Sequence, residues 1–428
     1  MKHAWLNELE QRGLLHQLSS PELAALLGSA RVSGYIGFDP TADSLHVGSL
    51  LQILMLVRLQ RAGHRPIAVV GGATGLIGDP SGKESERTML TEEQVAANSA
   101  GIRAQLARYL DPAGDALLVD NLDWTRDVSL VRFLRDIGKH FSVNAMVARD
   151  SVRMRLEARE HGISYTEFSY MLLQAYDYLV LYDRYGCRLQ MGGSDQWGNI
   201  VSGADLIRRL RGADAFALTV PLITRSDGKK FGKSEEGNVW LCPQRTSPYQ
   251  FHQFWLNVDD GEVVKLLKYF TFLPVQQIVE EIEPQVQTAP EKRQAQRVLA
   301  DEITRFVHGA DALLGAQRVA NLLFQKDADY RSFSAAELEE AFRDAPSTPI
   351  AASELGTPEA NIVSLLARTG VHPSKSRARQ DVLDGAVSVN NAVVRDAAYV
   401  LSQADLLAGG FAVLRKGKKH HHLLRVSP

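Results

Sequence analysis

The sequence predicts an α/β protein with three parts: a doubly wound parallel-sheet domain, an α-helical domain and a small α+β module. Short apolar runs that end in glycine or polar residues alternate with helical segments over the first 247 residues. The pattern then becomes helical, and the C-terminal end is short-stranded and basic. A length of 428 residues is enough for two to four domains, each with its own core.

The first strand–helix–strand unit is predicted from residues 33–38, 47–59 and 67–70. Apolar residues recur at helical spacing through the middle segment, and Gly63 is placed to end that helix. A helix that joins two such strands makes a right-handed crossover between parallel strands.

Two further strands are expected at residues 117–119 and 188–191, and each runs into a polar loop. In open α/β sheets, ligands bind beyond the carboxyl ends of the strands. The loops that follow these strands are therefore where functional residues are expected.

Changes in composition predict the domain boundaries. Residues 1–247 are expected to form the α/β domain, which is Rossmann-like in its strand and helix order, and residues 248–326 are expected to form the helical domain. Residues 327–358 mix Ser, Ala, Pro and charges without a long period, which favours a mostly loose linker. Residues 359–428 form the C-terminal module.

The charges are nearly balanced over the whole chain, with 48 Lys+Arg and 50 Asp+Glu. Residues 361–428, however, carry ten basic and four acidic residues. This excess favours a polyanionic partner, although a solubilising tail has the same composition. The run 416–422 (KGKKHHH) is interpreted as a basic patch and not as a metal site.

The cysteines and the apolar segments indicate the compartment. Cys187 and Cys242 belong to no C-x-x-C pair, so neither a disulfide framework nor a cysteine zinc site is expected. The N-terminus does not resemble a signal peptide, and no apolar stretch approaches the length of a membrane helix. A cytoplasmic protein without a membrane association is expected.

The segment 39–49 is the first candidate for binding a phosphate. A strand leads through a turn rich in Asp, Pro and Ser into a helix that opens at His46. Free amides and the positive dipole end of that helix favour anions, and Gly48 lets a ligand approach the backbone. Thr41 and His46 would donate hydrogen bonds to phosphoryl oxygens. The alternative is an ordinary capped helix.

The loop 224–234 is the second candidate. Lys230 and Lys233 flank Gly232, and two lysines in a flexible loop can neutralise a triphosphate as charge develops on it. A solvated basic turn is the alternative. The two candidates lie about 180 residues apart in the same α/β domain.

Together, residues 39–48 (DPTADSLHVG) and 230–234 (KFGKS) resemble the two signature motifs of class I aminoacyl-tRNA synthetases. Residues 71–83, 133–144, 170–177 and 192–199 are similar to blocks of the bacterial tyrosyl-tRNA synthetases, and the resemblance covers essentially the whole chain. One position departs from the pattern, because Ser49 stands where the family usually has a second histidine. Serine is a shorter donor and is never cationic.

The resemblance implies an enzyme that activates L-tyrosine with ATP to tyrosyl-adenylate and pyrophosphate, and then transfers tyrosine to the 3′ end of tRNA(Tyr). It also implies Mg²⁺ bound with ATP, no metal held by the protein itself, and a cytoplasmic homodimer that forms through residues 121–147.

The resemblance assigns roles to individual residues. The phenol hydroxyl of tyrosine would meet Tyr35 and Asp177, and its ammonium group would meet Asp79, Tyr170 and Gln174, with Gln190 as a further tyrosine-binding residue. The residues expected to bind ATP or the adenylate are Asp39, Gly48, Ser49, Gly193, Asp195, Gln196, Lys233 and Ser234. The expected catalytic residues are Thr41, His46, Lys83, Arg87, Lys230 and Lys233.

The C-terminal module is similar to an S4-type RNA-binding domain. Lys375, Arg377 and Arg379 at a helix start would contact tRNA phosphates, which position RNA without reading its sequence. A basic strand end would extend this contact surface, through Arg415, Lys416, Lys418 and Lys419. The turn at Asn390 and Asn391 replaces the Asn-Gly of the family, and asparagine tolerates the positive φ that such a turn needs.

Two alternatives remain at this point. A synthetase for another aromatic amino acid would share the signature motifs, but Tyr35 and Asp177 argue against it. An RNA-binding paralogue without catalytic activity would explain Ser49, but His46, Lys230 and Lys233 argue against it.

Overall fold

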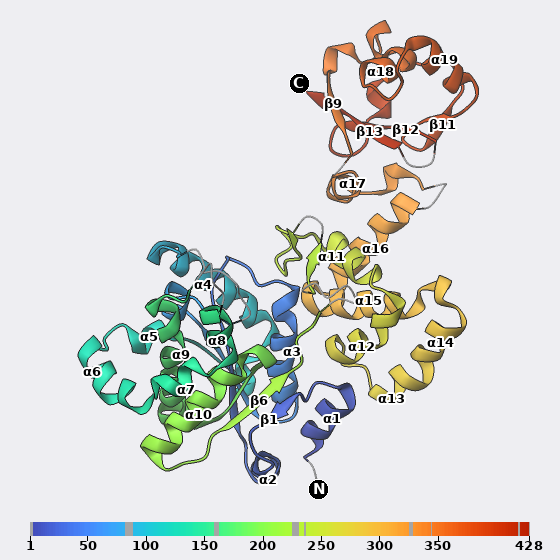
Figure 1. Ribbon diagram of the computed structural model, residues 1–428. Helices are drawn as coiled ribbons and strands as arrows, with labels where there is room; N and C mark the ends of the chain where they lie inside the picture. Colours follow the sequence, from blue (N-terminus) through green and yellow to red (C-terminus); the bar gives the residue numbers. More distant parts are fainter. Residues whose placement is uncertain are drawn as a thin grey trace. The chain divides into compact units, whose positions relative to one another are not determined.

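The computed structural model describes residues 3–81, 89–157, 162–224, 231–234, 237–324, 328–343, 345–417 and 420–427. The chain divides into two compact units (Figure 1). Unit 1 comprises Met1–Thr246 and Phe254–Ile303, and unit 2 comprises Ser247–Gln253 and Thr304–Pro428. No helix among these residues is both long and apolar enough to cross a membrane.

The core of unit 1 is a six-stranded sheet with the order β1-β6-β5-β2-β3-β4. All neighbouring strands are parallel except the edge strand β1, which pairs antiparallel with β6. The strands are β1 (Gln17–Leu18), β2 (Ser33–Phe38), β3 (Arg65–Val70), β4 (Leu117–Asp120), β5 (Cys187–Gly193) and β6 (Phe216–Val220). The strands predicted at 33–38, 67–70, 117–119 and 188–191 are thus confirmed.

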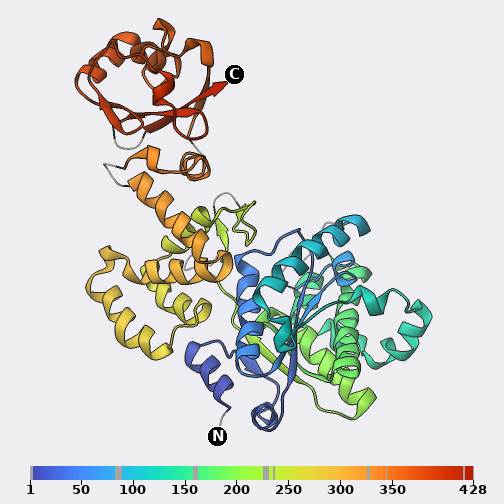
Figure 2. The same ribbon diagram turned by 180° about the vertical axis from the view of Figure 1, so that it is seen from behind.

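Helices cover both faces of this sheet, as doubly wound folds require (Figures 1 and 2). Tyr35 of β2 packs in one core with residues of α9 (Tyr165–Tyr185) and α10 (Trp197–Arg211). A side chain at Gly34 would point to the opposite face and would lie 2.9 Å from Leu59 of α3 (Val47–Arg61). Helix α4 (Glu92–Tyr109) packs beside α3 on that second face. Alternate residues of one buried strand therefore contact different helix layers.

The remaining helices of unit 1 are shorter. They are α1 (Ala4–Arg12), α2 (Glu22–Ser29), α5 (Leu122–Thr125), α6 (Leu130–Asp136), α7 (Val143–Val147), α8 (Asp150–Glu157), α12 (Asp260–Phe270), α13 (Val275–Gln277) and α14 (Glu283–Thr288). A two-stranded ribbon, β7 (Lys233–Ser234) and β8 (Gly237–Asn238), follows β6 in the chain.

The predicted boundary at residue 247 does not separate the helical segment from the sheet domain, because most of that segment belongs to unit 1. Two buried arginines attach it. Arg12 of α1 donates to the carbonyls of Lys268 and Leu273, and Arg58 of α3 donates to the carbonyl of Thr271. These bonds satisfy one carbonyl in the last turn of α12 and two in the residues that follow this helix. α11 (Pro248–Leu256) and α15 (Gln294–His308) each continue from one unit into the other.

Unit 2 continues through α16 (Ala310–Phe324) and α17 (Ala335–Ala341) into a five-stranded sheet with the order β11-β10-β12-β13-β9. Its strands are β9 (Ser347–Ala351), β10 (Val387–Val389), β11 (Ala392–Val394), β12 (Phe411–Lys416) and β13 (His420–Ser427). α18 (Ile362–Arg368) and α19 (Lys375–Leu383) pack on one face. Asn390 and Asn391 both have positive φ between β10 and β11, so the predicted turn forms.

The expectation of a loose linker at 327–358 is wrong for most of that segment. Tyr330 and Leu338 are buried in a core with Phe411 and Leu423 of the sheet. Strand β9 pairs in parallel with β13, about 75 residues later in the chain. A pairing partner that far away leaves no local periodicity in the sequence, which is why the strand was not predicted.

Candidate active site

A cavity of about 700 Å³ opens at the carboxyl ends of the central strands of unit 1. The strand order reverses between the neighbouring strands β2 and β5, because β3 follows on the far side of β2 and β6 follows on the far side of β5. Open α/β sheets bind ligands at such a reversal. Tyr35 of β2 and Gln190 of β5, which are partners across the two strands, both line the cavity. The site thus lies where the predicted topology places it.

The structure brings most of the predicted site residues to this one cavity. From the predicted tyrosine site these are Tyr35, Asp79, Tyr170, Gln174, Asp177 and Gln190. From the predicted nucleotide site these are Asp39, Thr41, His46, Gly48, Ser49, Gly193, Asp195 and Gln196. The two groups lie in one continuous space.

Several predicted residues fall where the structure gives no side-chain geometry. Lys83, Arg87 and Lys230 lie outside the described residues, as do Lys418 and Lys419 of the C-terminal module. The backbone of Lys233 and Ser234 forms β7, which pairs with β8.

At the deep end of the cavity, a buried carboxylate faces a buried phenol. Asp177 of α9 is 5% exposed and accepts hydrogen bonds from Asn121 Nδ2 at 2.9 Å and Trp124 Nε1 at 2.8 Å. Tyr35 is 2% exposed, and its hydroxyl has no hydrogen-bond partner among the described residues. An unpaired buried hydroxyl is costly, so its partner is expected to be a ligand.

Burial controls the protonation of both groups. It raises the pKa of Asp177 to about 7, although the hydrogen bonds from Asn121 and Trp124 act in the opposite direction. Burial and the neighbouring Asp177 also raise the pKa of Tyr35 well above its usual value. Tyr35 therefore stays a neutral hydroxyl, and Asp177 is a partly ionised acceptor at neutral pH. A ligand hydroxyl that both donates and accepts a hydrogen bond fits between them.

A second group of acceptors lies next to this pair. The buried Asp79 accepts from Gln196 Nε2 at 2.7 Å and from the backbone amide of Ser81 at 2.9 Å. Oxygen Oε1 of Gln174 and oxygen Oε1 of Gln190 are buried without a partner among the described residues. One carboxylate with two amide oxygens forms a site for a cationic donor such as an ammonium group.

Asp39 connects the two ends of the cavity. Its Oδ2 accepts from the hydroxyl of Tyr170 at 2.8 Å, and its Oδ1 accepts from Thr74 Oγ1 at 2.7 Å. A side chain at Gly71 would come within 2.2 Å of Asp39 Oδ1, so only glycine fits there. Thr74 in turn accepts from Asn121. The hydroxyl of Tyr170 is thus held by Asp39 and is oriented before any ligand binds.

The other end of the cavity is built on the start of α3. His46 caps this helix, and its Nδ1 accepts the backbone N–H of Gly48 at 3.0 Å. The ring proton of the neutral imidazole therefore lies on Nε2. A side chain at Gly48 would come within 2.6 Å of this ring. Glycine is therefore needed at position 48 to leave room for the His46 ring. This is in addition to the access to the backbone that the sequence suggested for a ligand.

Exposure distinguishes this end from the deep one. Thr41, Gly48 and Asp195 are exposed, and His46 and Ser49 are half-buried. Gln52, one turn after Ser49 on α3, also lines the cavity. When the side-chain amide of Gln52 is turned so that its nitrogen faces the backbone acceptors, this nitrogen donates to the carbonyls of Gly48 and Ser49.

The predicted RNA-binding residues of unit 2 do not all share one face of the sheet. Lys375, Arg377 and Arg379 lie on α19, and the Nζ of Lys416 donates to the carbonyl of Val371, which precedes that helix. The neighbouring Arg415 points to the opposite face, where it donates to Ser388 Oγ. Successive residues of a strand face opposite sides, so Lys416 extends the α19 surface and Arg415 does not.

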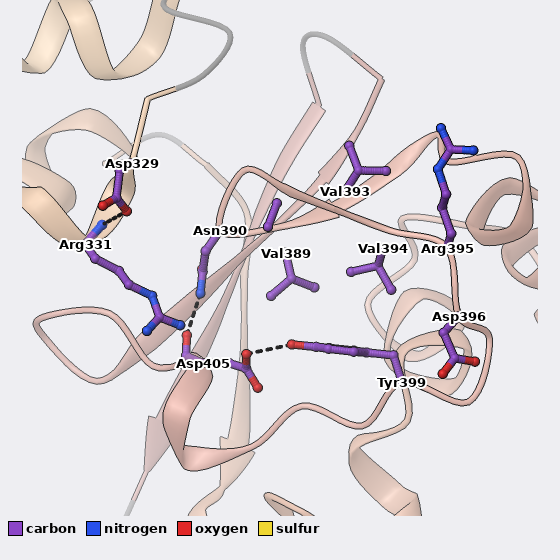
Figure 3. A pocket seen from close by; sticks show the side chains of 11 residues that line it. Asp329, Arg331, Val389, Asn390, Val393, Val394, Arg395, Asp396, Tyr399 and Asp405 are labelled. Atoms are coloured by element: carbon purple, nitrogen blue, oxygen red, sulfur yellow. Dashed lines mark hydrogen bonds between the residues drawn. The ribbon is translucent and has the colours of Figure 1, made fainter.

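Unit 2 also contains a pocket of about 360 Å³ beside the β10–β11 turn (Figure 3). The Tyr399 hydroxyl donates to Asp405 Oδ1 at 2.6 Å, and Arg331 donates to the carbonyl of Ala404. Three carboxylates and two arginines line the pocket. None of the predicted site residues lines this pocket.

Sequence reasoning missed several residues of the active site. Asn121 and Trp124 bind Asp177, and Thr74 binds Asp39. Asn121 lies two residues after the strand predicted at 117–119 and directly follows the observed strand β4, in the polar loop where functional side chains were expected, so its position was a usable signal. Trp124 and Thr74 carry no comparable pattern in the sequence.

Comparisons with known proteins identify the family of the chain. The family described as "tRNA synthetases class I (W and Y)" matches residues 29–325, and the family described as "Tyrosine--tRNA ligase SYY-like C-terminal domain" matches residues 337–424.

Similar proteins share nearly the whole chain. A tyrosine–tRNA ligase of Bacillus caldotenax is 52% identical over 98% of this chain and 99% of its own, and that of Geobacillus kaustophilus has the same identity and coverage. Among solved structures, a C-terminally truncated mitochondrial tyrosyl-tRNA synthetase of Aspergillus nidulans is 32% identical with a TM-score of 0.67, over 75% of this chain and 94% of that chain. The resemblance read from the two signature motifs is therefore confirmed, and the chain belongs to the class I aminoacyl-tRNA synthetases and, within them, to the tyrosine–tRNA ligases.

Proposed function

We propose that the deep end of the cavity binds the phenol of L-tyrosine. The Tyr35 hydroxyl donates to the phenol oxygen, and the phenol hydroxyl donates to the Asp177 carboxylate. The observation that carries this proposal is the buried, unpartnered hydroxyl of Tyr35 beside a buried carboxylate. Phenylalanine offers no hydroxyl and would leave both groups without their ligand partner.

The ammonium group of tyrosine binds the neighbouring acceptors. Asp79 supplies the negative charge, and the unpartnered Oε1 of Gln174 accepts one of the N–H groups. Tyr170 lines the same part of the cavity and is held in place by Asp39. Gln190, whose Oε1 is also unpartnered, completes the tyrosine site.

ATP occupies the exposed end, with its ribose near Asp39, Gly193, Asp195 and Gln196. The tyrosine carboxylate attacks the α-phosphorus in line, the bond to the β-phosphate oxygen breaks, and pyrophosphate leaves. Thr41 and the Nε2–H of His46 donate to phosphoryl oxygens as charge develops there, and Ser49 supplies a shorter donor in the same turn. The ammonium groups of Lys230 and Lys233, with Lys83 and Arg87, neutralise the leaving group. Mg²⁺ enters as the counter-ion of ATP.

In the transfer step, a ribose hydroxyl at the 3′ end of tRNA(Tyr) forms an ester with the tyrosyl carbonyl of the adenylate, the bond between that carbonyl and the phosphate oxygen breaks, and AMP leaves. The α19 surface of unit 2, formed by Lys375, Arg377, Arg379 and Lys416, contacts phosphates of this tRNA. Arg377 also lies 3.3 Å from Asp381, which fixes its orientation. We place the enzyme in the cytoplasm, where ATP and tRNA are available to it.

The active form is a homodimer that joins through residues 121–147. Exposed apolar side chains gather on two short helices of this segment: Leu130 and Val131 of α6 are 72% and 77% exposed, and Val143 of α7 is 61% exposed. Large apolar side chains that are exposed on neighbouring segments of the chain support an interface there. Val131→Glu places a charge on this surface, and sedimentation velocity should then report a smaller species than the parent chain.

ATP–pyrophosphate exchange with tyrosine, phenylalanine and tryptophan, offered separately, tests the assignment. Exchange is expected with tyrosine alone, and Lys233→Ala should abolish it, which excludes a contaminating enzyme. Exchange with phenylalanine at a similar rate would contradict the roles of Tyr35 and Asp177. Absence of exchange with all three would support the catalytically inactive RNA-binding alternative.

A further inference from the structure

The segment that follows the second signature motif is joined to the first one through its backbone. Val47 donates its amide to the carbonyl of Val239 at 2.9 Å, and Leu241 donates to the carbonyl of Leu45 at 2.9 Å. His46 and Trp240 are partners in this short antiparallel contact. The amide of Trp240 also donates to Thr246 Oγ1 at 3.0 Å, so its backbone is fixed on both sides.

Side-chain contacts also join these two segments, beside the imidazole of His46. The ring of Trp240 lies edge to face with the ring of His46, with centroids 6.0 Å apart and planes at 75°. The guanidinium carbon of Arg245 lies 4.0 Å from the centroid of the Trp240 ring. Arg245 also pairs with Asp43 at 3.0 Å, and Asp43 is three residues before His46 in the signature loop. The side chains of Asp43, Arg245, Trp240 and His46 therefore form a continuous row of contacts, and both ends of this row lie on the signature loop.

The contacts restrict one particular freedom of His46. Its hydrogen bond from the Gly48 amide fixes the position of Nδ1 but still permits the ring to tilt about that bond. An edge-to-face contact with a neighbouring aromatic ring opposes such a tilt. A cation stacked on an indole keeps that indole in place, and the ion pair with Asp43 fixes the cation.

We propose that Trp240 is a positioning residue for the activation step: it sets the plane of the His46 imidazole so that Nε2–H points to the phosphoryl oxygens of ATP, and Arg245 holds Trp240 in place. The proposal rests on the function proposed above for His46. It assigns Trp240 no contact with substrate. Trp240 therefore acts on the rate of the chemical step and not on the binding of tyrosine.

Steady-state ATP–pyrophosphate exchange by the full chain, together with equilibrium dialysis of labelled tyrosine, tests this. Trp240→Leu should lower kcat ~10-fold while the dissociation constant of tyrosine stays unchanged, because a small misorientation of a catalytic donor is costly. Trp240→Phe keeps an aromatic edge and should retain most of kcat. In a His46→Ala background, Trp240→Leu should have no further effect, since its role requires the imidazole.

Arg245→Met tests the same proposal if Trp240→Leu does not fold. The Arg245 side chain is 39% exposed, so its replacement should leave the hydrophobic core intact. It should lower kcat ~3-fold in the wild-type background and not at all in the His46→Ala background. The matched control is Arg208→Met, which breaks the exposed pair with Asp205 on α10 and should leave kcat unchanged. A full kcat in Trp240→Leu, or losses that add to those of His46→Ala, would overturn the proposal. Wild-type protein without exchange would instead refute the proposed function.

Discussion

The two ends of the active-site cavity are built differently. At the tyrosine end, Tyr35 and Asp177 are buried, and both oxygens of Asp177 already accept hydrogen bonds from Asn121 and Trp124. At the nucleotide end, Thr41 and Gly48 are exposed, and His46 accepts a hydrogen bond from its own helix start and lies edge to face with Trp240.

Under the proposed function, this difference separates selection of the amino acid from catalysis. A buried set of fixed polar groups rejects ligands that leave those groups unpaired. Exposed donors at a helix start can instead follow charge as it develops on a phosphoryl group. Substitutions at the deep end should therefore change KM for tyrosine, and substitutions at the exposed end should change kcat.

The largest effect is expected at the exposed end. His46→Ala removes a donor to the developing phosphoryl charge, and kcat for pyrophosphate exchange should fall on the order of 100-fold to 1000-fold. KM for tyrosine should not change, because the proposed tyrosine site does not include the histidine. The measurement is steady-state exchange with tyrosine varied at saturating ATP. A parallel rise of KM for tyrosine would mean that the two ends are not separate.

Asp177→Asn should have the next largest effect, at the deep end. An asparagine amide would direct an N–H group toward the donors of Asn121 or Trp124, so one hydrogen bond is lost and the acceptor for the phenol is weakened. KM for tyrosine should rise roughly 100-fold, with kcat at saturation much less affected. Titration of the exchange rate with tyrosine measures both. A KM close to that of the wild type would contradict the assignment of the phenol to this carboxylate.

The pH dependence of tyrosine binding should also distinguish the deep end of the cavity from the exposed end. Burial raises the pKa of Asp177 to about 7, and in the proposed tyrosine site the ionised carboxylate is the form that accepts the phenol hydroxyl. Tyrosine affinity should therefore weaken as pH falls through about 7 and should be constant above it. Asn121→Ala removes a hydrogen bond that lowers this pKa, so the loss of affinity should begin at a higher pH, with affinity at neutral pH reduced ~5-fold. Equilibrium dialysis over a series of pH values checks both, and an unshifted midpoint in Asn121→Ala would contradict the role of Asp177 ionisation in tyrosine binding.

The smallest effect concerns Ser49. Ser49→His restores the histidine that the family pattern usually has, and a longer donor that can be cationic should raise kcat ~3-fold without changing KM for tyrosine. Ser49→Ala is the matched control, and it should lower kcat slightly. A lower kcat in Ser49→His than in Ser49→Ala would show that the turn has adapted to the small side chain.

Much of this arrangement could be predicted from the sequence because its signals are local. An apolar run or a helix-capping residue within a few positions marks each of three elements: the strand at 33–38, the helix that starts at His46 and the strand at 117–119. The motif resemblance named side chains from distant segments, such as Asp79 and Asp177, which the structure places around one cavity.

What the sequence did not predict depends on contacts between distant segments. Strand β9 is recognised only through its pairing with β13, and Trp240 only through its packing on His46. The opposite orientations of Arg415 and Lys416 follow from the strand period, but their assignment to faces needs the packed core.

The most direct test of the account is the dissociation constant of L-tyrosine for two variants, measured by equilibrium dialysis without ATP. His46→Ala should bind tyrosine as tightly as the wild type, and Asp177→Asn should bind it far more weakly, because only the second substitution alters the deep end of the cavity. Equal loss of binding in both variants would contradict the separation of the two ends. So would full binding by Asp177→Asn.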